Sequence, residues 1–467
     1  VMDETFDAQG ARGLDRQIIA SGVSSFCLMM RAAKAACDRL LDEHPQSVIC
    51  LAGPGNNGGD AYGVASLLIL AGIPIQLVAL TTPTGDALKA RHFFEDVGGV
   101  VLDTVTALNA ADWVVDGLLG TGCDRPPEDA IASAIHWIHA QRAKGALVMS
   151  LDVPSGLNAS TGQAYCPSVE ADMTLTFLAL KTGLFTGEGP SMSGEVCFDA
   201  LKPWSVNMLA PHTRLISEER INLPSHSKTA HKGSRGSVLV VGGRHGMEGA
   251  GQLCGLAALR TGAGKVFWAT DALVSDIPEL IRVPWDLNAI TDCATDCLAV
   301  VIGPGLGLDA GPVIEALWVL NVPLVVDADA LNWLSEHPLP NRQAPWIGTP
   351  HPLEAHRLTG QSFDDRFTML ESLETLYEAT WVLKGAGTLV TGTPTWLNPL
   401  ANPVLGTAGS GDVLAGMIGS LWAQGSKSPA ITGVWLHSQA FLAALGQRGS
   451  DVIASDAIEV IGRIKTA

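Results

Sequence analysis

Short apolar runs alternate with amphipathic stretches through most of the first half of the chain. A helical pattern covers residues 11–43, and the alternation begins after it. The predicted strands are 47–52, 75–80, 113–118 and 146–152, and the predicted helices are 59–71, 86–97 and 128–143. Short apolar runs separated by helices are typical of a parallel sheet that is covered on both faces. The pattern therefore predicts a doubly wound α/β domain.

The alternation stops near residue 217 and restarts after it. Residues 217–233 are polar, contain Pro224 and lack an apolar period, so the domain boundary is predicted between residues 216 and 217. The later predicted strands are 237–243, 265–270, 299–305, 323–329, 345–351 and 381–392, with helices at 249–261 and from about 411, 430 and 451. The halves do not repeat one another, so 1–216 and 217–467 are expected to be two different α/β folds.

Composition excludes several classes of partner. The formal net charge is −18 and no basic stripe is present, which argues against nucleic acid. No apolar run reaches the roughly 18 residues that a membrane span needs, and the first residues do not resemble a signal peptide. Nine cysteines are scattered singly, as in reduced intracellular proteins. We therefore expect a cytoplasmic protein without a membrane partner, and the sequence leaves open whether it forms a homo-oligomer.

The sharpest local motif of the first half is GPGNNGGDAYG, residues 53–63, which follows a predicted strand and opens a helix. Its first part matches the GxGxxG turn of dinucleotide-binding folds. That fingerprint expects an acidic residue about 20 positions on, at the end of the next strand. Here the next strand ends in Thr81 and Thr82. A hydride-transferring Rossmann enzyme is therefore the weaker interpretation.

Two further polar loops follow predicted strands. Asp116 ends one strand and precedes LLGTGCDRP, and Asp152 ends another and precedes VPSG. Because the carboxyl ends of parallel strands meet at one edge of the sheet, the loops should share a cleft. The alternative is that aspartates beside glycines only cap helices. The candidate residues of the cleft are Asn56, Asn57, Asp60, Asp116, Asp152 and Ser155.

The most informative motif of the second half is GTAGSGDVLAG, residues 406–416, which runs from a loop into an apolar helix. Glycines at a helix start expose amides and the positive end of the helix dipole, which favours an anion. Asp412 would repel a resting phosphate, but it suits a base that deprotonates a hydroxyl attacking a phosphoryl group. An ordinary capped helix is the alternative. No Walker A motif is present, because Gly264 and Lys265 are followed by Val266.

As a set, these motifs resemble the NAD(P)H-hydrate repair enzymes over nearly the entire chain. GPGNNGGDAYG, VDGLLGTGCDRP, SLDVPSGL and residues 181–194 resemble the epimerase domain, whose fold is Rossmann-like. Residues 406–416 resemble part of the dehydratase domain, which has a ribokinase-like α/β fold. The other dehydratase-like segments are 231–233, 249–251, 303–307, 327–332, 349–354 and 384–388.

The resemblance implies a substrate for the first half: NADH or NADPH that has gained water at carbon 6 of the nicotinamide ring (NAD(P)HX). It implies that Asn57, Asp116 and Ser155 bind a potassium ion, as hard oxygen ligands can. Epimerising carbon 6 needs a group that gives and takes a proton, and Asp152 is our candidate. The residues implied to hold the hydrated nicotinamide are Asn56, Asn57, Gly58, Gly59, Asp60, Gly120, Thr121, Gly122, Cys123, Asp124, Arg125, Pro126 and Asp152.

For the second half, the resemblance implies phosphorylation of the carbon-6 hydroxyl by ADP or ATP, with Mg²⁺, followed by loss of phosphate. Phosphate is a better leaving group than hydroxide. The residues implied to bind the nucleotide are those of the glycine loop 406–411, including Gly409, Ser410 and Gly411, together with Lys384, Gly385, Ala386, Gly387 and Thr388. The residues implied to contact the hydrated nicotinamide are Ala250, Gly305, His351 and Asp412.

The sequence departs from the family pattern at three places. Ala61 stands where glycine is usual, and a left-handed conformation there would cost about 1–2 kcal/mol, so either the turn is right-handed or the loop is altered. Leu353 replaces a frequent glycine, and Val404-Leu405 replaces Gly-Met. Two other functions stay open at this point. One is a ribokinase-like small-molecule kinase with a regulatory NAD-binding domain, and the other has a first half that acts only as a binding or scaffold domain.

Overall fold

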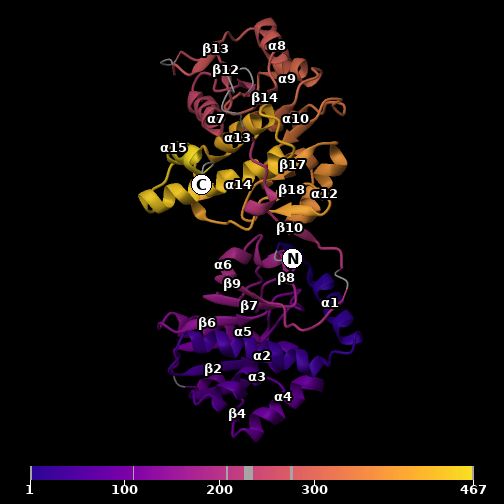
Figure 1. The fold of residues 1–467 in the computed structure, drawn as a ribbon, viewed down its shortest axis with the longest axis vertical. Coiled ribbons are helices and arrows are strands. Elements are labelled where there is room, and N and C mark those ends of the chain that lie inside the picture. Colours follow the sequence, from indigo (N-terminus) through magenta and orange to yellow (C-terminus); the bar gives the residue numbers. More distant parts are fainter. Residues whose placement is uncertain (1–2, 109, 207–208, 226–234, 274–276, 465–467) are drawn as a thin grey trace. The chain divides into compact units, whose positions relative to one another are not determined.

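The computed structural model describes residues 3–108, 110–206, 209–225, 235–273 and 277–464. The predicted motif at 231–233 lies outside these residues. By their internal contacts the residues form two compact units, Val1–Arg214 and Leu215–Ala467 (Figure 1). Each unit is described by itself below.

The first unit is built on a parallel seven-stranded sheet. Its order is β4 (Val101–Leu102), β3 (Ile75–Ala79), β2 (Val48–Ala52), β5 (Trp113–Gly117), β6 (Leu147–Leu151), β7 (Met173–Phe177) and β9 (Glu195–Asp199). The chain builds outward from β2 in one direction and then from β5 in the other. This reversal makes the sheet doubly wound and leaves a crevice at the carboxyl ends of β2 and β5, where open α/β sheets bind ligands.

Helices cover both faces of this sheet. All five residues of β2 and of β5 are buried, as continuous apolar runs require. One face packs against α1, α2, α3 and α4, and the other packs against α5. Their bounds are α1 Ala8–Ala20, α2 Ser25–Asp42, α3 Asn56–Leu70, α4 Gly85–Asp96 and α5 Asp129–Arg142.

The prediction of one long helix over residues 11–43 is wrong. The chain forms two helices, α1 and α2, which meet at an angle of 119°. Gly22 lies between them with a left-handed φ of 104°, a conformation that ends a helix at little cost for glycine. Among the described residues, no single helix is long and apolar enough to cross a membrane, and only the bent pair of α1 and α2 passes on length and composition.

Short elements complete the first unit. Strand β1 (Glu4–Phe6) pairs in parallel with β8 (Leu180–Lys181) and antiparallel with β10 (Thr213–Leu215). This small ladder holds Lys181 at the end of β8. The remaining short elements of this unit are the 3₁₀ turns Val105–Ala107 and Thr182–Leu184 and helix α6 (Gly189–Ser193), whereas the 3₁₀ turn Glu218–Arg220 belongs to the second unit.

The second unit also has a parallel sheet with a reversal. The order is β13 (Leu280–Val283), β12 (Lys265–Ala269), β11 (Ser237–Val241), β14 (Ala299–Ile302), β15 (Leu324–Val326), β16 (Trp346–Gly348) and β17 (Thr380–Leu383). Antiparallel β18 (Leu389–Val390) and β19 (Thr395–Leu397) extend it beyond β17. The reversal lies between β11 and β14, so the loops that follow these strands meet at one edge.

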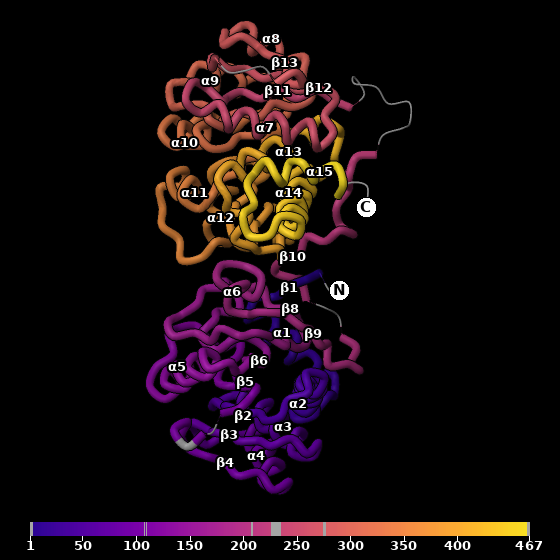
Figure 2. The backbone as a smooth tube through the Cα atoms, turned by 90° about the vertical axis from the view of Figure 1, so that its left-hand side faces the viewer, coloured from indigo at the N-terminus to yellow at the C-terminus, as the bar shows by residue number. Residues whose placement is uncertain are grey.

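The helices of the second unit follow the predicted alternation. One face of the sheet packs against α7, α13, α14 and α15, and the last three lie side by side in Figures 1 and 2. The bounds are α7 Glu248–Thr261, α8 Leu287–Thr295, α9 Gly311–Trp318, α10 Ala328–Glu336, α11 Pro352–Thr359, α12 Arg366–Leu376, α13 Ser410–Ala423, α14 Pro429–Arg448 and α15 Ala454–Ile464, with a 3₁₀ turn at Pro403–Gly406.

Candidate functional sites

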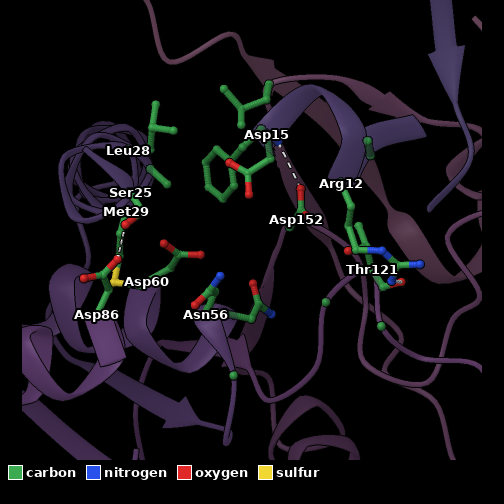
Figure 3. Close-up of a pocket in the computed structure, with 18 of the residues that line it drawn as sticks. Arg12, Asp15, Ser25, Leu28, Met29, Asn56, Asp60, Asp86, Thr121 and Asp152 are labelled. Atoms are coloured by element: carbon green, nitrogen blue, oxygen red, sulfur yellow. Dashed lines mark hydrogen bonds between the residues drawn. The ribbon is translucent and has the colours of Figure 1, made fainter. Parts of the chain in front are cut away.

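A cleft of about 550 Å³ lies at the reversal point of the first unit. Its walls come from α1, the start of α2, the first turn of α3 and the loop that follows β5, and Asp152 faces it from the end of β6 (Figure 3). A cavity of this size accommodates a ligand as large as a nucleotide fragment. It is therefore the candidate site of this unit.

The glycine turn before α3 places asparagines in the cleft. Helix α3 begins at Asn56, and both Asn56 and Asn57 line the cavity. Gly58 has a packing role, because a Cβ there would lie 2.0 Å from the carbonyl oxygen of Gly53. Gly59 is likewise buried, packed against α2. Ala61 is buried in right-handed helix, so the replacement of glycine at this position costs no left-handed strain.

Only the first part of the loop after β5 lines the cleft. Gly120, Thr121 and Gly122 line the cleft. Cys123 is buried, with its Sγ 3.6 Å from the carbonyl oxygen of Arg125. The structure places the exposed residues Asp124, Arg125 and Pro126 outside the lining.

The three residues assigned to potassium lie together. Asp116 is completely buried and accepts hydrogen bonds from Ser150 Oγ at 2.8 Å, Ser155 N at 2.9 Å, Ser155 Oγ at 2.6 Å and Leu118 N at 3.2 Å. Asn57 Nδ2 donates to the carbonyl oxygen of Leu119 at 2.7 Å, which leaves its Oδ1 as a ligand oxygen. Burial raises the pKa of Asp116, and the hydrogen bonds oppose that rise. Within the described part of the chain, no ion pair includes Asp116.

Asp152 lies in a left-handed backbone conformation, with φ 65°, directly after β6. Its Oδ1 accepts hydrogen bonds from Lys181 Nζ, from Thr176 Oγ1 at 3.2 Å and from Phe177 N at 3.2 Å. No described residue donates to its Oδ2. One carboxylate oxygen is thus fixed by the protein, and the other is available to a ligand.

Two more carboxyl groups face Asp152. Asp60, from α3, and Asp15, from α1, both line the cleft (Figure 3). Burial raises the pKa of Asp60 well above its usual value, and the charges of Asp152 and Asp15 raise it further. Burial also raises the pKa of Asp15, which Lys181 opposes. The cleft therefore contains two carboxyl groups, Asp15 and Asp60, that tend to keep their protons.

In the second unit, Asp412 lies in the first turn of α13. The N-cap of that helix is Gly409, and no side chain caps it. Asp412 accepts no hydrogen bond from any described residue, so the capping interpretation has no structural support. Burial raises the pKa of Asp412 to about 7; Asp327 contributes to the rise, and Lys384 opposes it.

Lys384 is held beside this helix end by acidic residues. Its Nζ donates to Asp327 Oδ1 at 2.7 Å and lies 3.9 Å from Glu354 Oε2. Thr349 Oγ1 donates to the same Asp327 oxygen at 2.8 Å. Lys384 therefore offers a positive charge at the start of α13, and its partner in the free protein is Asp327, not Asp412.

The residues assigned to the hydrated nicotinamide come from different loops. A Cβ on Gly305 would lie 3.1 Å from the Cβ of Ala250, so these two positions are adjacent. His351 caps α11: its Nδ1 accepts from Leu353 N at 3.1 Å and Glu354 N at 3.2 Å. Burial and the charge of Lys384 lower the pKa of His351. A neutral His351 therefore presents Nε2 as a donor.

The loop assigned to the nucleotide, residues 384–388, is organised by a half-buried cation, Arg366. Arg366 donates to the carbonyl oxygens of Leu383 at 2.9 Å, Lys384 at 3.0 Å and Gly387 at 2.6 Å, and also to that of Ala386. Burial lowers the pKa of Arg366 to about 10. The carbonyl groups of the loop therefore point toward the Arg366 guanidinium. Within the loop, Thr388 Oγ1 also donates to the carbonyl oxygen of Gly385 at 3.0 Å.

Leu353 and Val404-Leu405, which replace the residues usual in the family, lie in regular turns of the second unit. Leu353 is exposed in the first turn of α11. Val404 is buried in the 3₁₀ turn before α13, and the carbonyl oxygen of Leu405 accepts from Ser410 Oγ at 2.7 Å. The Val-Leu pair thus fixes the entry to the glycine loop.

Sequence reasoning placed Lys181 and Asp327 only within family-like segments, without a role of their own, and missed Arg366 altogether. Lys181 and Arg366 are single basic residues in mostly apolar or mixed segments, and each meets its partners only in the folded chain. A basic residue inside the apolar run FLALKTGL was the available signal for Lys181, because a buried lysine needs a charged partner.

Comparison with known proteins identifies the family. Residues 25–183 match the family described as YjeF-related protein N-terminus, and residues 238–463 match the family NAD(P)H-hydrate dehydratase. The chain is 36% identical to the bifunctional NAD(P)H-hydrate repair enzyme Nnr of Coxiella burnetii, over 95% of this chain and 96% of that protein. It is 34% identical to the enzyme of the same name from Escherichia coli K12, over 95% and 90%. The chain belongs to the bifunctional NAD(P)H-hydrate repair enzyme family.

Family membership confirms the resemblance found in the motifs of the two halves. The fold of the second unit has a solved counterpart in a ribokinase-like superfamily protein from Enterococcus faecalis. That likeness has a TM-score of 0.50 and 24% identity, over 56% of this chain and 98% of the other. It supports the predicted ribokinase-like fold of this NAD(P)H-hydrate repair enzyme.

Proposed function

We propose that the chain restores hydrated NADH and NADPH, with the first unit as an epimerase and the second as a nucleotide-dependent dehydratase. The observation that carries this proposal is the position of Asp412. It is a partly buried carboxylate without a partner among the described residues, at a glycine-rich helix start, in the segment that matches the dehydratase family.

In the epimerase site, Asp152 acts as the base. Carbon 6 of NAD(P)HX carries the hydroxyl and is bonded to the ring nitrogen N1. When Asp152 takes the hydroxyl proton, the C6–N1 bond breaks, its electron pair moves to N1, and an aldehyde forms at carbon 6. When carbon 6 presents its other face, N1 re-forms the bond and Asp152 returns the proton to the oxygen. The configuration is thereby inverted with no net loss of atoms.

Potassium is proposed at Asn57, Asp116 and Ser155. These residues fit a hard monovalent cation because they offer amide, carboxylate and hydroxyl oxygens. Asp116 is also a buried carboxylate with hydrogen-bond donors but no described cation to balance its charge. A bound potassium ion would supply that positive charge next to the loop of Gly120 and Thr121.

In the dehydratase site, Asp412 accepts the proton of the carbon-6 hydroxyl. The oxygen of that hydroxyl attacks the terminal phosphoryl group of ADP or ATP at the same time. The phosphorus–oxygen bond to the nucleotide breaks as the new bond forms. The carbon-6 oxygen then leaves as phosphate with its electron pair, and loss of a proton from carbon 5 restores the ring double bond. Lys384 and the amides of Ser410 and Gly411 are placed to bind the nucleotide phosphates.

Mg²⁺ is proposed to enter with the nucleotide. The described residues contain no group of three acidic, histidine or cysteine side chains that could hold a metal. Mg²⁺ commonly binds through substrate phosphates and a few carboxylates, not through a complete protein cage. The proposed carboxylates at this edge are Asp327 and Asp329.

A single assay tests the proposed function. Purified protein is incubated with mixed epimers of NADHX or NADPHX and with ADP or ATP, and the dihydronicotinamide absorbance and phosphate are followed. We expect both epimers to be consumed and phosphate to be released in equal amount. A stable phosphorylated product would indicate a kinase. An unused R epimer, beyond its spontaneous conversion, would indicate that the first unit is only a binding domain.

A further inference from the structure

Lys181 is a buried cation in the cleft of the first unit. Its side chain is 4% exposed, at the end of β8. Its Nζ donates to the carbonyl oxygen of Phe177 at 2.7 Å and to Asp152 Oδ1. Lysine is almost never fully buried unless it is paired, so this burial depends on Asp152.

The charges around Asp152 are otherwise negative. Asp15 faces it from α1 and Asp60 from α3, while Asp86, from α4, is neutralised by Lys89 at 2.7 Å. The other cations that line the cleft, Arg12 and Arg16, are exposed on α1. Of the described residues that line the cleft, Lys181 is therefore the one buried cation, and its ion pair is with Asp152.

The pair also sets the direction of the carboxylate. Lys181, Thr176 and the amide of Phe177 all donate to Oδ1 of Asp152, and the backbone amide of Asp152 donates to the carbonyl oxygen of Leu175 at 2.8 Å. No described residue donates to Oδ2, and Asp152 lines the cavity together with Asp15 and Asp60 (Figure 3). A base fixed on one oxygen and open on the other is pre-organised for proton transfer.

We propose that Lys181 is a positioning residue of the epimerase, which holds Oδ1 of Asp152 and aims its free oxygen at the carbon-6 hydroxyl. This inference rests on the proposed epimerase function of the cleft. The charge of Lys181 lowers the pKa of Asp15 and of Asp60, so without it both of these neighbouring carboxyl groups should keep their protons to higher pH. The orientation of Asp152 would loosen as well, because its Oδ1 would lose the Lys181 donor.

Four variants of the full chain test the role of Lys181. Lys181→Met removes the charge and the donor, Lys181→Gln keeps a donor without charge, and Lys181→Arg keeps the charge. Thr176→Val is the matched control, because it removes a neutral donor to the same carboxylate oxygen. Epimerisation is followed as a function of pH, with kcat and KM determined separately, and the dehydratase activity of each preparation reports on the integrity of the chain.

We expect Lys181→Met and Lys181→Gln to lower kcat by about 10- to 100-fold with a smaller change in KM, which is less than the factor of about 100 to 10,000 for loss of the general base itself. The acid limb of their pH profiles should move to higher pH. Lys181→Arg should keep the acid limb in place, and Thr176→Val should shift it little. Unchanged acid limbs in both neutral variants would overturn the proposal, and so would an equal shift in Lys181→Arg. If Lys181→Met does not accumulate as folded protein, the comparison of Lys181→Gln with Lys181→Arg still tests the proposal.

The wild-type chain separates this proposal from the function on which it depends. If wild-type protein does not interconvert the epimers faster than solution alone, the epimerase function is wrong. If the wild type is active and only the Lys181 variants behave differently from the expectation, the epimerase stands and the positioning role fails.

Discussion

The substitution Asp412→Asn should abolish dehydration and at the same time stabilise the second unit. Asparagine keeps the shape of the side chain but cannot accept the hydroxyl proton. Loss of a general base costs a factor of about 100 to 10,000. Because Gly409 is the N-cap of α13 and no side chain caps it, the exchange removes no capping bond. Epimerisation, which takes place in the first unit, should be unaffected.

The stability effect has a definite size and sign. Burial and Asp327 raise the pKa of Asp412 from 3.8 to about 7. A pKa raised by folding means that the charged form is disfavoured in the folded state. The cost is absent below pH 3.8 and complete above about pH 7. The gap corresponds to about 4 kcal/mol as an upper value. The Asn variant should therefore gain free energy of unfolding at pH 8 and gain little at pH 4.

Two measurements test this prediction on the same protein. Turnover is measured as phosphate release and recovered dihydronicotinamide with S-NAD(P)HX and ADP or ATP, and nucleotide affinity is measured by calorimetry. Denaturant unfolding is compared at pH 4 and pH 8. Asp309→Asn is the control, since Asp309 lies in the same unit, forms an ion pair with Arg244 and has no role in the proposed reaction. We expect this control to lose less turnover and to gain less stability.

The two outcomes can fail separately. Turnover close to that of the wild type would show that Asp412 is not the base and would remove the main support for phosphoryl transfer. Lost turnover with equal stability at both pH values would keep the base but would show that Asp412 is ionised without cost in the folded protein. A loss of nucleotide affinity would contradict the assignment of the phosphates to Lys384 and the amides of the glycine loop.

Four further predictions follow from the two sites. Protein truncated to Leu215–Ala467 should dehydrate the S epimer and leave the R epimer to its spontaneous conversion; equal use of both would contradict the division of labour. Asp116→Ala should weaken substrate binding to the epimerase and abolish its response to potassium, without loss of dehydration; an unchanged potassium response would contradict the site. Arg366→Lys should weaken nucleotide binding about tenfold, because lysine cannot replace a charge-assisted bond to each carbonyl, and calorimetry checks this. Dehydration should fall below about pH 7, where Asp412 is protonated; a rate of dehydration that stays constant from pH 8 to pH 5 would refute this.

The parts of the fold that could be predicted are those specified by local pattern. Strands β2 and β5 are fully buried apolar runs, VICLA and WVVDG, and they are bounded by polar or glycine-rich segments. Strands β7 and β9 were not predicted, because MTLTF and EVCFD mix polar and apolar residues. Thr174 and Thr176 can be buried in β7 because, in the folded chain, their hydroxyls donate to the carbonyl oxygen of Ser193 and to Asp152 Oδ1.

The candidate sites divide in the same way. The glycine turns carry their function in consecutive residues, so Asn56, Asn57 and Asp412 could be selected before the fold was known. Lys181 meets Asp152 across 29 positions of sequence, and Arg366 meets the loop 384–388 from another helix. Such partnerships depend on which elements become neighbours. No local spacing indicates them.

The two sites differ in whether a lysine pairs with the catalytic aspartate. In the first unit, the buried Lys181 is bound directly to Asp152, the catalytic candidate. In the second unit, Lys384 is bound to Asp327, so Asp412 has neither a cation of its own nor a hydrogen-bond donor among the described residues. Burial, with a contribution from Asp327, raises the pKa of Asp412 to about 7, near the value at which a base both accepts and releases a proton readily. This arrangement suits phosphoryl transfer. A permanently charged carboxylate would repel the nucleotide phosphates. A carboxyl group that titrates near neutral pH, as Asp412 does, can be uncharged when the phosphates bind and can still accept the hydroxyl proton.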